Sequence, residues 1–233
     1  MILGELAMAP LLYVGLTCAI YSAAVAINRR SGSHPLANPV LLSVCLLITI
    51  LSLANVDYRD YFANVQLIHF LLGPAVVALA VPLFRHHQKV RHAALPIIGG
   101  VVCGSLAGAV TTLAICFAAG LDGAMSASLS TKSVTAPVAM GIAEQIGGAP
   151  SLAAVFAVLT GMFGAALGPW LLSKFKVRTA MERGLAMGTT SHGQGAARSL
   201  QESDEAGAFA GMAMGMTAIA MAVVLPMLAR LVP

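Results

Sequence analysis

Two short polar stretches carry the residues that could do chemistry in this chain: "STKSVTAP" (Ser130–Pro137) and "TTSHGQG" (Thr189–Gly195). Each lies between long apolar segments, and together they hold a lysine, a histidine and several hydroxyls. A lysine ammonium can pair with a carboxylate, and hydroxyls can donate hydrogen bonds to the carboxylate oxygens. The two stretches therefore predict a small anion site inside a membrane protein.

Lys132 is the most informative residue of the first stretch, because a lysine at membrane depth costs roughly 2.5–3.5 kcal/mol on insertion scales. We expect it to balance the charge of a substrate carboxylate; the alternatives are a pair with Glu144 or a side chain that reaches the external surface. Glu144 in turn could couple transport to protons, or could end a helix at the external boundary.

Four hydroxyl side chains flank the two breaks. We expect them to donate to carboxylate or hydroxyl oxygens of a substrate, to cap the following helix, or to do both. They are Ser133, Thr135, Thr190 and Ser191.

In the second stretch, His192 could bind substrate, titrate in the physiological range or serve as a structural residue. Gly193 belongs to the same predicted site and loosens the chain beside His192. Arg198 follows six residues after His192. It could reach the site, but pairing with Glu202 at i+4 is favoured.

Each break precedes a run that is compatible with a helix, Val138–Ile146 and Ala196–Glu202. The N-terminus of a helix offers free N–H groups and a partial positive charge. Two such ends that meet from opposite sides would form an anion site near the membrane midplane.

The elements that must position these residues are membrane helices. Of the 233 residues, 58% are hydrophobic and 9% are charged, whereas an ordinary soluble domain has about 25% charged residues. A membrane barrel would instead show segments of alternating hydrophobicity. A helical span needs about 20 apolar residues. Six stretches reach or approach that length: Met8–Ile27, Pro39–Asn55, Leu67–Phe84, Ala93–Ala119, Ser151–Ser173 and Ala206–Ala229.

The charges predict an orientation. Basic residues gather after the first, third and fifth of these spans, so the positive-inside rule places those loops in the cytoplasm and the N-terminus outside. Basic residues in such short loops indicate orientation, and no nucleic-acid partner is expected. The sequence has no GxxxxGK[ST] motif, so ATP-driven transport is not expected either.

The segment 120–150 must leave and return on the outer face, because the spans on both sides of it end there. The segment 180–205 is the equivalent on the inner face. Both are too apolar for simple loops and are predicted to be re-entrant, although two broken helices that cross fully are an alternative. We therefore predict an N-terminal four-span region, residues 1–119, for scaffolding and oligomerisation, and a transport core, residues 120–233.

The two segments also resemble each other. A shift of about 58 positions places Thr131 on Thr189, Ser133 on Ser191, Ala139 on Ala197 and Glu144 on Glu202. Together with the topology, this predicts an all-α polytopic protein of about six spans, with two broken or re-entrant segments arranged as an inverted repeat, which is typical of secondary transporters.

Four stretches resemble the LrgB/CidB family, which includes the bacterial YohK proteins: "LLGPAVVALAVPL", "KSVTAPVAMGIAEQIGG", "LTGMFGAALGPWLL" and "RGLAMGTTSHGQGAARSLQESDEAGAFAGMAMG". They are also similar to the C-terminal half of the plastid glycolate/glycerate transporter. The resemblance covers roughly Leu67 to Pro226. It implies either carboxylate transport or an antiholin-like control of murein hydrolase export and autolysis, together with a smaller LrgA-type membrane partner.

The residues and the resemblance together lead to one main expectation. It is a secondary transporter of small monocarboxylates, of the glycolate, glycerate or pyruvate type, in the bacterial inner membrane. The alternative is an antiholin-like regulator or pore, which would not need broken segments at membrane depth. No enzyme activity, metal or cofactor is expected, and coupling to protons or sodium is left open. Glycine faces such as Gly100, Gly104 and Gly108 suggest helix packing, and a homodimer is expected.

Overall fold

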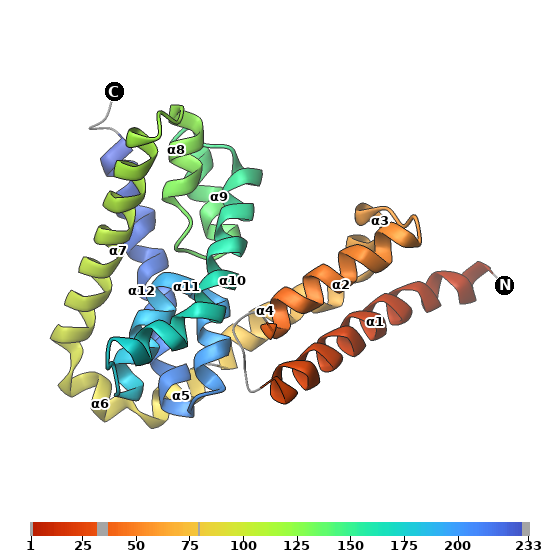
Figure 1. The fold of residues 1–233 in the computed structure, drawn as a ribbon, viewed down its shortest axis with the longest axis horizontal. Coiled ribbons are helices and arrows are strands. Elements are labelled where there is room, and N and C mark those ends of the chain that lie inside the picture. Colours follow the sequence, from red (N-terminus) through yellow and green to blue (C-terminus); the bar gives the residue numbers. More distant parts are fainter. Residues whose placement is uncertain (1, 32–36, 79, 230–233) are drawn as a thin grey trace. The chain divides into compact units, whose positions relative to one another are not determined.

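The computed structural model of the chain describes residues 2–31, 37–78 and 80–229. These ranges are helical and contain no strand (Figure 1). The helices in chain order are α1 (Ile2–Arg30), α2 (Pro39–Leu53), α3 (Tyr58–Asn64), α4 (Gln66–Ala78), α5 (Ala80–Arg85), α6 (His87–His92), α7 (Ala94–Ala118), α8 (Gly123–Ser130), α9 (Ala136–Gln145), α10 (Pro150–Lys174), α11 (Ala180–Leu200) and α12 (Asp204–Ala229).

Among the described helices, four are long and apolar enough to cross a membrane: the Pro10–Arg30 part of α1, then α7, α10 and α12. α2 and α3 together would make a fifth span, bent by 119°. A multi-pass membrane protein is therefore confirmed in outline, but the count of six spans is not. The stretch Leu67–Phe84 forms the shorter helices α4 and α5, and both contain a proline, which disrupts long helices.

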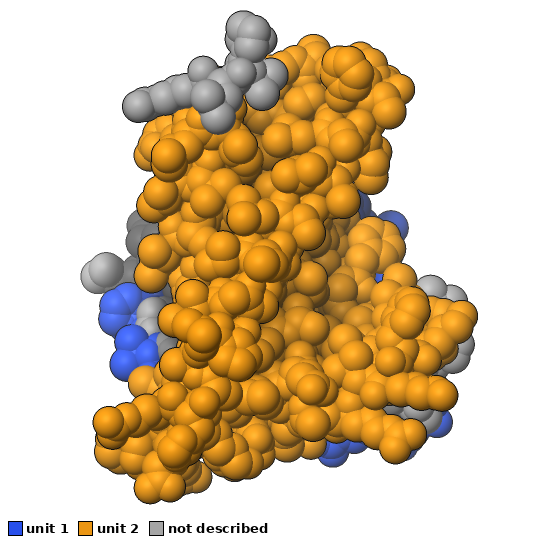
Figure 2. Space-filling model, turned by 90° about the vertical axis from the view of Figure 1, so that its left-hand side faces the viewer, with its two compact units in different colours: residues 1–77 blue, residues 78–233 orange. Residues whose placement is uncertain are grey.

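The chain forms two compact units, residues 1–77 and residues 78–233 (Figure 2). In the first unit, α1 packs on α2 and α3. Tyr61 of α3 is buried there beside Leu51 and Val65. The hydroxyls of Tyr61 and Thr17 lie 2.9 Å apart, and the rings of Tyr61 and Tyr13 meet edge to face at 5.7 Å. This small cluster holds the first unit together.

The second compact unit is drawn in orange in Figure 2. Its core combines alanines of α7, α9 and α10 with the larger side chains of Ile142, Met221 and Leu225. Because small residues let helices approach closely, such a core is typical of membrane bundles. The unit includes α7, which the predicted division at residue 119 assigns to the N-terminal region. That functional division stays a prediction.

The first predicted break is present in the structure. α8 ends at Ser130, residues 131–135 are not helical, and α9 starts at Ala136, two residues earlier than predicted. The chain then returns on itself, because the backbone N–H of Ala149 donates to Ser128 Oγ at 2.8 Å. Residues 128–149 thus form a hairpin whose two ends are joined by this hydrogen bond.

The second predicted break lies inside α11, at His192, whose φ of 41° and ψ of −129° are not helical. A straight helix would separate residues 19 positions apart by about 28 Å. Instead, Arg183 and Glu202, 19 positions apart, form an ion pair at 2.8 Å. Gly195 also lies against the backbone oxygen of Met187. α11 is therefore a helical hairpin that turns at His192.

The two hairpins begin at opposite ends of α7. α8 follows the C-terminal end of α7 directly. The base of the α11 hairpin lies beside the start of α12, where Gly184 packs against Ala206. The start of α12 is tied to α6, just before α7, by an ion pair of Lys89 and Glu205 at 2.7 Å. In Figure 1, α8 lies at one end of this unit and α6 at the other.

Candidate functional site

Both breaks contact the middle of α7. A Cβ added to Gly104 would lie 3.4 Å from Thr189 Cγ2, and one added to Gly108 would lie 3.8 Å from Ser133 Oγ. These glycines are one helical turn apart, about 6 Å along the axis. They lie on either side of Leu106, the midpoint of the 25-residue helix. Both hairpins therefore reach α7 within one helical turn of its midpoint.

Polar atoms gather at the same level in the other two long helices. Ser105 Oγ of α7 donates to Thr217 Oγ1, near the middle of α12, at 3.4 Å, and both residues are buried. The tip of the α11 hairpin lies on the middle of α10, where His192 Nε2 is 2.9 Å from the Ala157 carbonyl. An otherwise apolar bundle thus has a polar layer at its centre.

Lys132 was predicted to bring a cation to this site. Its side chain is partly buried, and its Nζ donates to Ser133 Oγ at 3.3 Å. Within the described part of the chain, no carboxylate forms an ion pair with it. The alternative pair with Glu144 is absent because Glu144 is exposed in the last turn of α9. Eight helical residues after Ala136 place it about 12 Å further along the axis.

The predicted hydroxyls divide into two kinds. Ser133 and Ser191 are buried at the breaks. Thr190 is exposed and donates to the Ala186 carbonyl at 2.8 Å within its own helix. Thr135 precedes α9 in the N-cap position, but its side chain makes no capping hydrogen bond. Its hydroxyl is therefore not used for the capping role that was expected of it.

His192 has a structural role in this conformation. The ring is buried, and the Nε2–H donates to the carbonyl of Ala157. Its positive φ is uncommon for a residue with a side chain and marks a strained turn. The ring also requires Gly161, because a Cβ there would lie 2.7 Å from His192 Cε1. Gly193, the next residue, is partly buried beside Met214 of α12.

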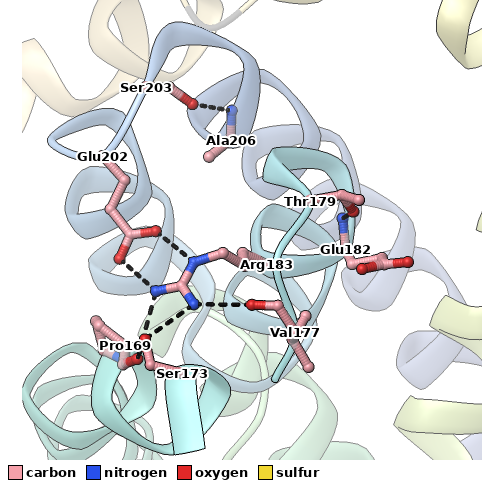
Figure 3. A network of polar contacts seen from close by, with 9 residues as sticks. All are labelled: Pro169, Ser173, Val177, Thr179, Glu182, Arg183, Glu202, Ser203 and Ala206. Carbon is pink, nitrogen blue, oxygen red and sulfur yellow. Dashed lines mark hydrogen bonds and ion pairs between the residues drawn. The ribbon is translucent and has the colours of Figure 1, made fainter. Parts of the chain in front are cut away.

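The expected pairing of Arg198 with Glu202 is wrong. Glu202 lies after the end of α11 and pairs with Arg183 (Figure 3). Because the hairpin brings both of its ends together, the tertiary contact replaces the local i+4 pair. The hydrogen bonds that Arg183 donates to the Glu202 carboxylate, together with the charge of that carboxylate, raise the pKa of Arg183 against the opposing effect of partial burial.

Some residues of this region were not predicted. Gln194 donates to the Val158 carbonyl at 3.3 Å, and its Oε1 is buried without a partner. Gly164 of α10 lies directly against Ser191. The glycines of α10 repeat at spacings of three and four residues, Gly161, Gly164 and Gly168, which indicates a helix-packing face. That pattern could have identified the packing face of α10, but not that α11 packs on it.

The arrangement provides one cation without a carboxylate partner, two buried hydroxyls and the starts of two short helices. This is a donor set suited to a small anion. Within the described ranges, no three His, Cys, Asp or Glu side chains lie close enough to hold a metal ion. The site's chemistry therefore comes from hydrogen bonds and a single ammonium.

Comparison with known proteins relates almost the whole chain to one family. The family model described as LrgB-like matches residues 17–231. YxaC of Bacillus subtilis (strain 168), named only as an uncharacterized protein, is 37% identical over 205 residues, 88% of each chain. The "Antiholin-like protein LrgB" of Bacillus mycoides (strain KBAB4) is 28% identical over 220 residues, 94% of this chain and 96% of the relative. No solved structure matches the chain.

Proposed function

The chain belongs to the LrgB-like family, and from that premise we propose that it is a secondary transporter of small monocarboxylates in the bacterial inner membrane. One observation carries this proposal: Lys132, at the tip of a hairpin and at the level of the helix midpoints, has no carboxylate partner among the described residues. Because an unpaired ammonium is costly at that depth, a substrate carboxylate is its natural partner.

The neighbouring groups fit the same ligand. Ser133 and Ser191 are buried at the two breaks and supply hydroxyl donors. α9 begins just after the first break, and the second half of α11 begins just after His192. Their free N–H groups add partial positive charge without adding a second side-chain cation. Proton or sodium coupling remains part of this proposal, with His192 and Glu144 as the titratable candidates.

We propose further that the two hairpins form an inverted repeat. The shift of about 58 positions supports this, because it pairs residues with the same surroundings. Thr131 at the start of the first break and Thr189 just before the second are both buried, and so are Ser133 and Ser191. Each break is followed by a short helix and then by a membrane-length helix, α10 or α12. Approach from opposite ends of α7 suits alternating access to a central site.

Counterflow uptake in proteoliposomes tests the carrier. We expect saturable uptake of labelled glycolate, glycerate, pyruvate or lactate by the wild type, and its loss in Lys132→Ala. Lys89→Ala is the matched control, because Lys89 is exposed and already paired with Glu205. Absence of uptake for all four acids, with and without an LrgA-type partner, would contradict the proposal.

A second candidate is an antiholin-like regulator of cell-wall hydrolysis. The names of relatives from Bacillus mycoides and Bacillus cereus favour it over the carrier, and it does not require substrate binding at Lys132. Under this proposal, the purified protein with its LrgA-type partner would modulate the leakage of large dyes from liposomes, and Lys132→Ala would leave that effect unchanged. Leakage of dyes without carboxylate uptake would favour this candidate.

A further inference from the structure

We propose that Arg183 is a positioning residue: it clamps the base of the α11 hairpin to Glu202 and to the end of α10, and so fixes where the hairpin tip lies. The proposal rests on the proposed carrier function for its transport readout, but the clamp itself can be tested without transport.

The guanidinium of Arg183 donates two parallel hydrogen bonds to the carboxylate of Glu202. Its Nε donates to Oε2 at 2.8 Å, and its Nη2 donates to Oε1 at 3.0 Å. The side chains are 15% and 23% exposed, so both are mostly shielded from water. Paired, partly shielded contacts of this kind are stronger and more directional than a single exposed ion pair. Figure 3 shows the guanidinium and carboxylate facing each other edge to edge.

The same guanidinium also holds the end of α10. Nη1 donates to the Val177 carbonyl at 3.1 Å and to Ser173 Oγ at 3.3 Å. Nη2 donates to the Pro169 carbonyl at 3.3 Å. The C-terminal end of a helix carries partial negative charge, which favours a cation there. All three nitrogens are therefore used, and one side chain joins α10, the start of α11 and the turn into α12.

This junction lies at the base of the hairpin whose tip forms part of the candidate site. Along the hairpin, Gly195 packs on Met187, and at the tip His192 and Ser191 pack on Gly161 and Gly164 of α10. α10 thus holds the hairpin at both ends. Release of the base would leave the tip attached to α10 only through close packing and the hydrogen bonds of His192 and Gln194, so its position would become less defined.

The acidic turn between α11 and α12 offers a matched control. Glu205 is three residues after Glu202 and also forms an ion pair, with Lys89 of α6. That pair has one hydrogen bond, and the lysine side chain is 57% exposed. In the described part of the chain, neither the Lys89 nor the Glu205 side chain has a hydrogen bond to α10 or α11. Both carboxylates are paired, but only the Glu202 side chain is hydrogen-bonded to the hairpin base.

The experiment compares Glu202→Gln with Glu205→Gln, Arg183→Lys, and the double exchange Arg183→Glu with Glu202→Arg, all in proteoliposomes. We expect Glu202→Gln to raise the KM of uptake at least tenfold with Vmax per folded protein within twofold, and Glu205→Gln to change neither by more than twofold. Arg183→Lys keeps the positive charge but loses the planar guanidinium that makes two parallel hydrogen bonds to the carboxylate. It should therefore raise KM about as much as Glu202→Gln. The double exchange should return KM to within about threefold of the wild type.

A residue needed only for folding would lower the amount of active protein and leave KM unchanged. Equal effects of Glu202→Gln and Glu205→Gln, or an unchanged KM in Glu202→Gln, would therefore overturn the proposal. If the wild type transports none of the acids, the carrier proposal fails, and amide hydrogen exchange in nanodiscs decides on the clamp alone. Faster exchange of residues 184–200 in Glu202→Gln than in Glu205→Gln supports it, and equal exchange overturns it.

Discussion

The close approach of the second hairpin to α10 depends on the absence of a side chain at Gly164. Ser191 lies against Gly164, so an added methyl group there has no room. We expect Gly164→Ala to lower stability by about 1–3 kcal/mol, the usual cost of overpacking. Gly99→Ala is the control, because nothing lies within 4 Å of its Cβ position. It should be neutral or slightly stabilising. Thermal unfolding in detergent measures both, and equal shifts would contradict the packing argument.

The backbone at His192 provides a second test at the residue scale. Its φ of 41° suits glycine better than any residue with a Cβ. His192→Gly and His192→Ala both lose the hydrogen bond to Ala157. Only the alanine variant keeps the strain, so we expect it to be the less stable of the two by about 1 kcal/mol. A glycine variant no more stable than the alanine variant in thermal unfolding would show that the turn relaxes without cost.

At the scale of the element, the first hairpin is closed by Ser128. Its Oγ accepts from the N–H of Ala149 at 2.8 Å and donates to the Ala124 carbonyl at 2.7 Å. Ser128→Ala leaves the Ala149 N–H without that acceptor, at a cost of about 1–3 kcal/mol. We expect faster amide exchange in residues 123–149. Thr111→Ala is the control, because Thr111 bonds only to carbonyls of its own helix, and similar exchange in both variants would argue against a closing role.

The sequence predicted more of the first hairpin than of the second. The first break was located to within two residues, because Pro137 is tolerated in the first turn of a helix but not in its interior, so a new helix has to start there. The second was located near His192, but the sequence predicted no ion pair across its base. Glu202 has Arg198 four residues before it and Arg183 nineteen residues before it. Only the fold of the hairpin decides between these two arginines, because it brings Arg183 to Glu202.

At the scale of the whole molecule, orientation is the open prediction. The basic segment 85–92 is expected in the cytoplasm and the turn at 120–122 outside, by the positive-inside rule. In a variant without its native cysteines, Leu121→Cys should react with a membrane-impermeant thiol reagent in intact cells, because Leu121 is exposed. Gln88→Cys, also exposed, should react only after permeabilisation. The reverse pattern would invert the proposed topology.

The sequence by itself determined the kind of molecule: an all-helical membrane protein of the LrgB-like family with two broken segments. These features depend on composition, on runs of apolar residues and on local helix breakers, which act over a few neighbouring positions. It did not determine the span count, since α4 and α5 are shorter than the apolar stretch that contains them.

Only the tertiary structure decided which residues meet. It brought Thr189 and Ser133 against Gly104 and Gly108, one turn apart on α7, and it paired Glu202 with Arg183. It also left Lys132 without a carboxylate partner among the described residues. The contacts with α7 and the pair of Glu202 with Arg183 join residues far apart in the chain. Their distance is set by how helices pack and where a hairpin turns, and neither is encoded in a local pattern. The polar layer at the centre of the bundle is therefore a property of the packing.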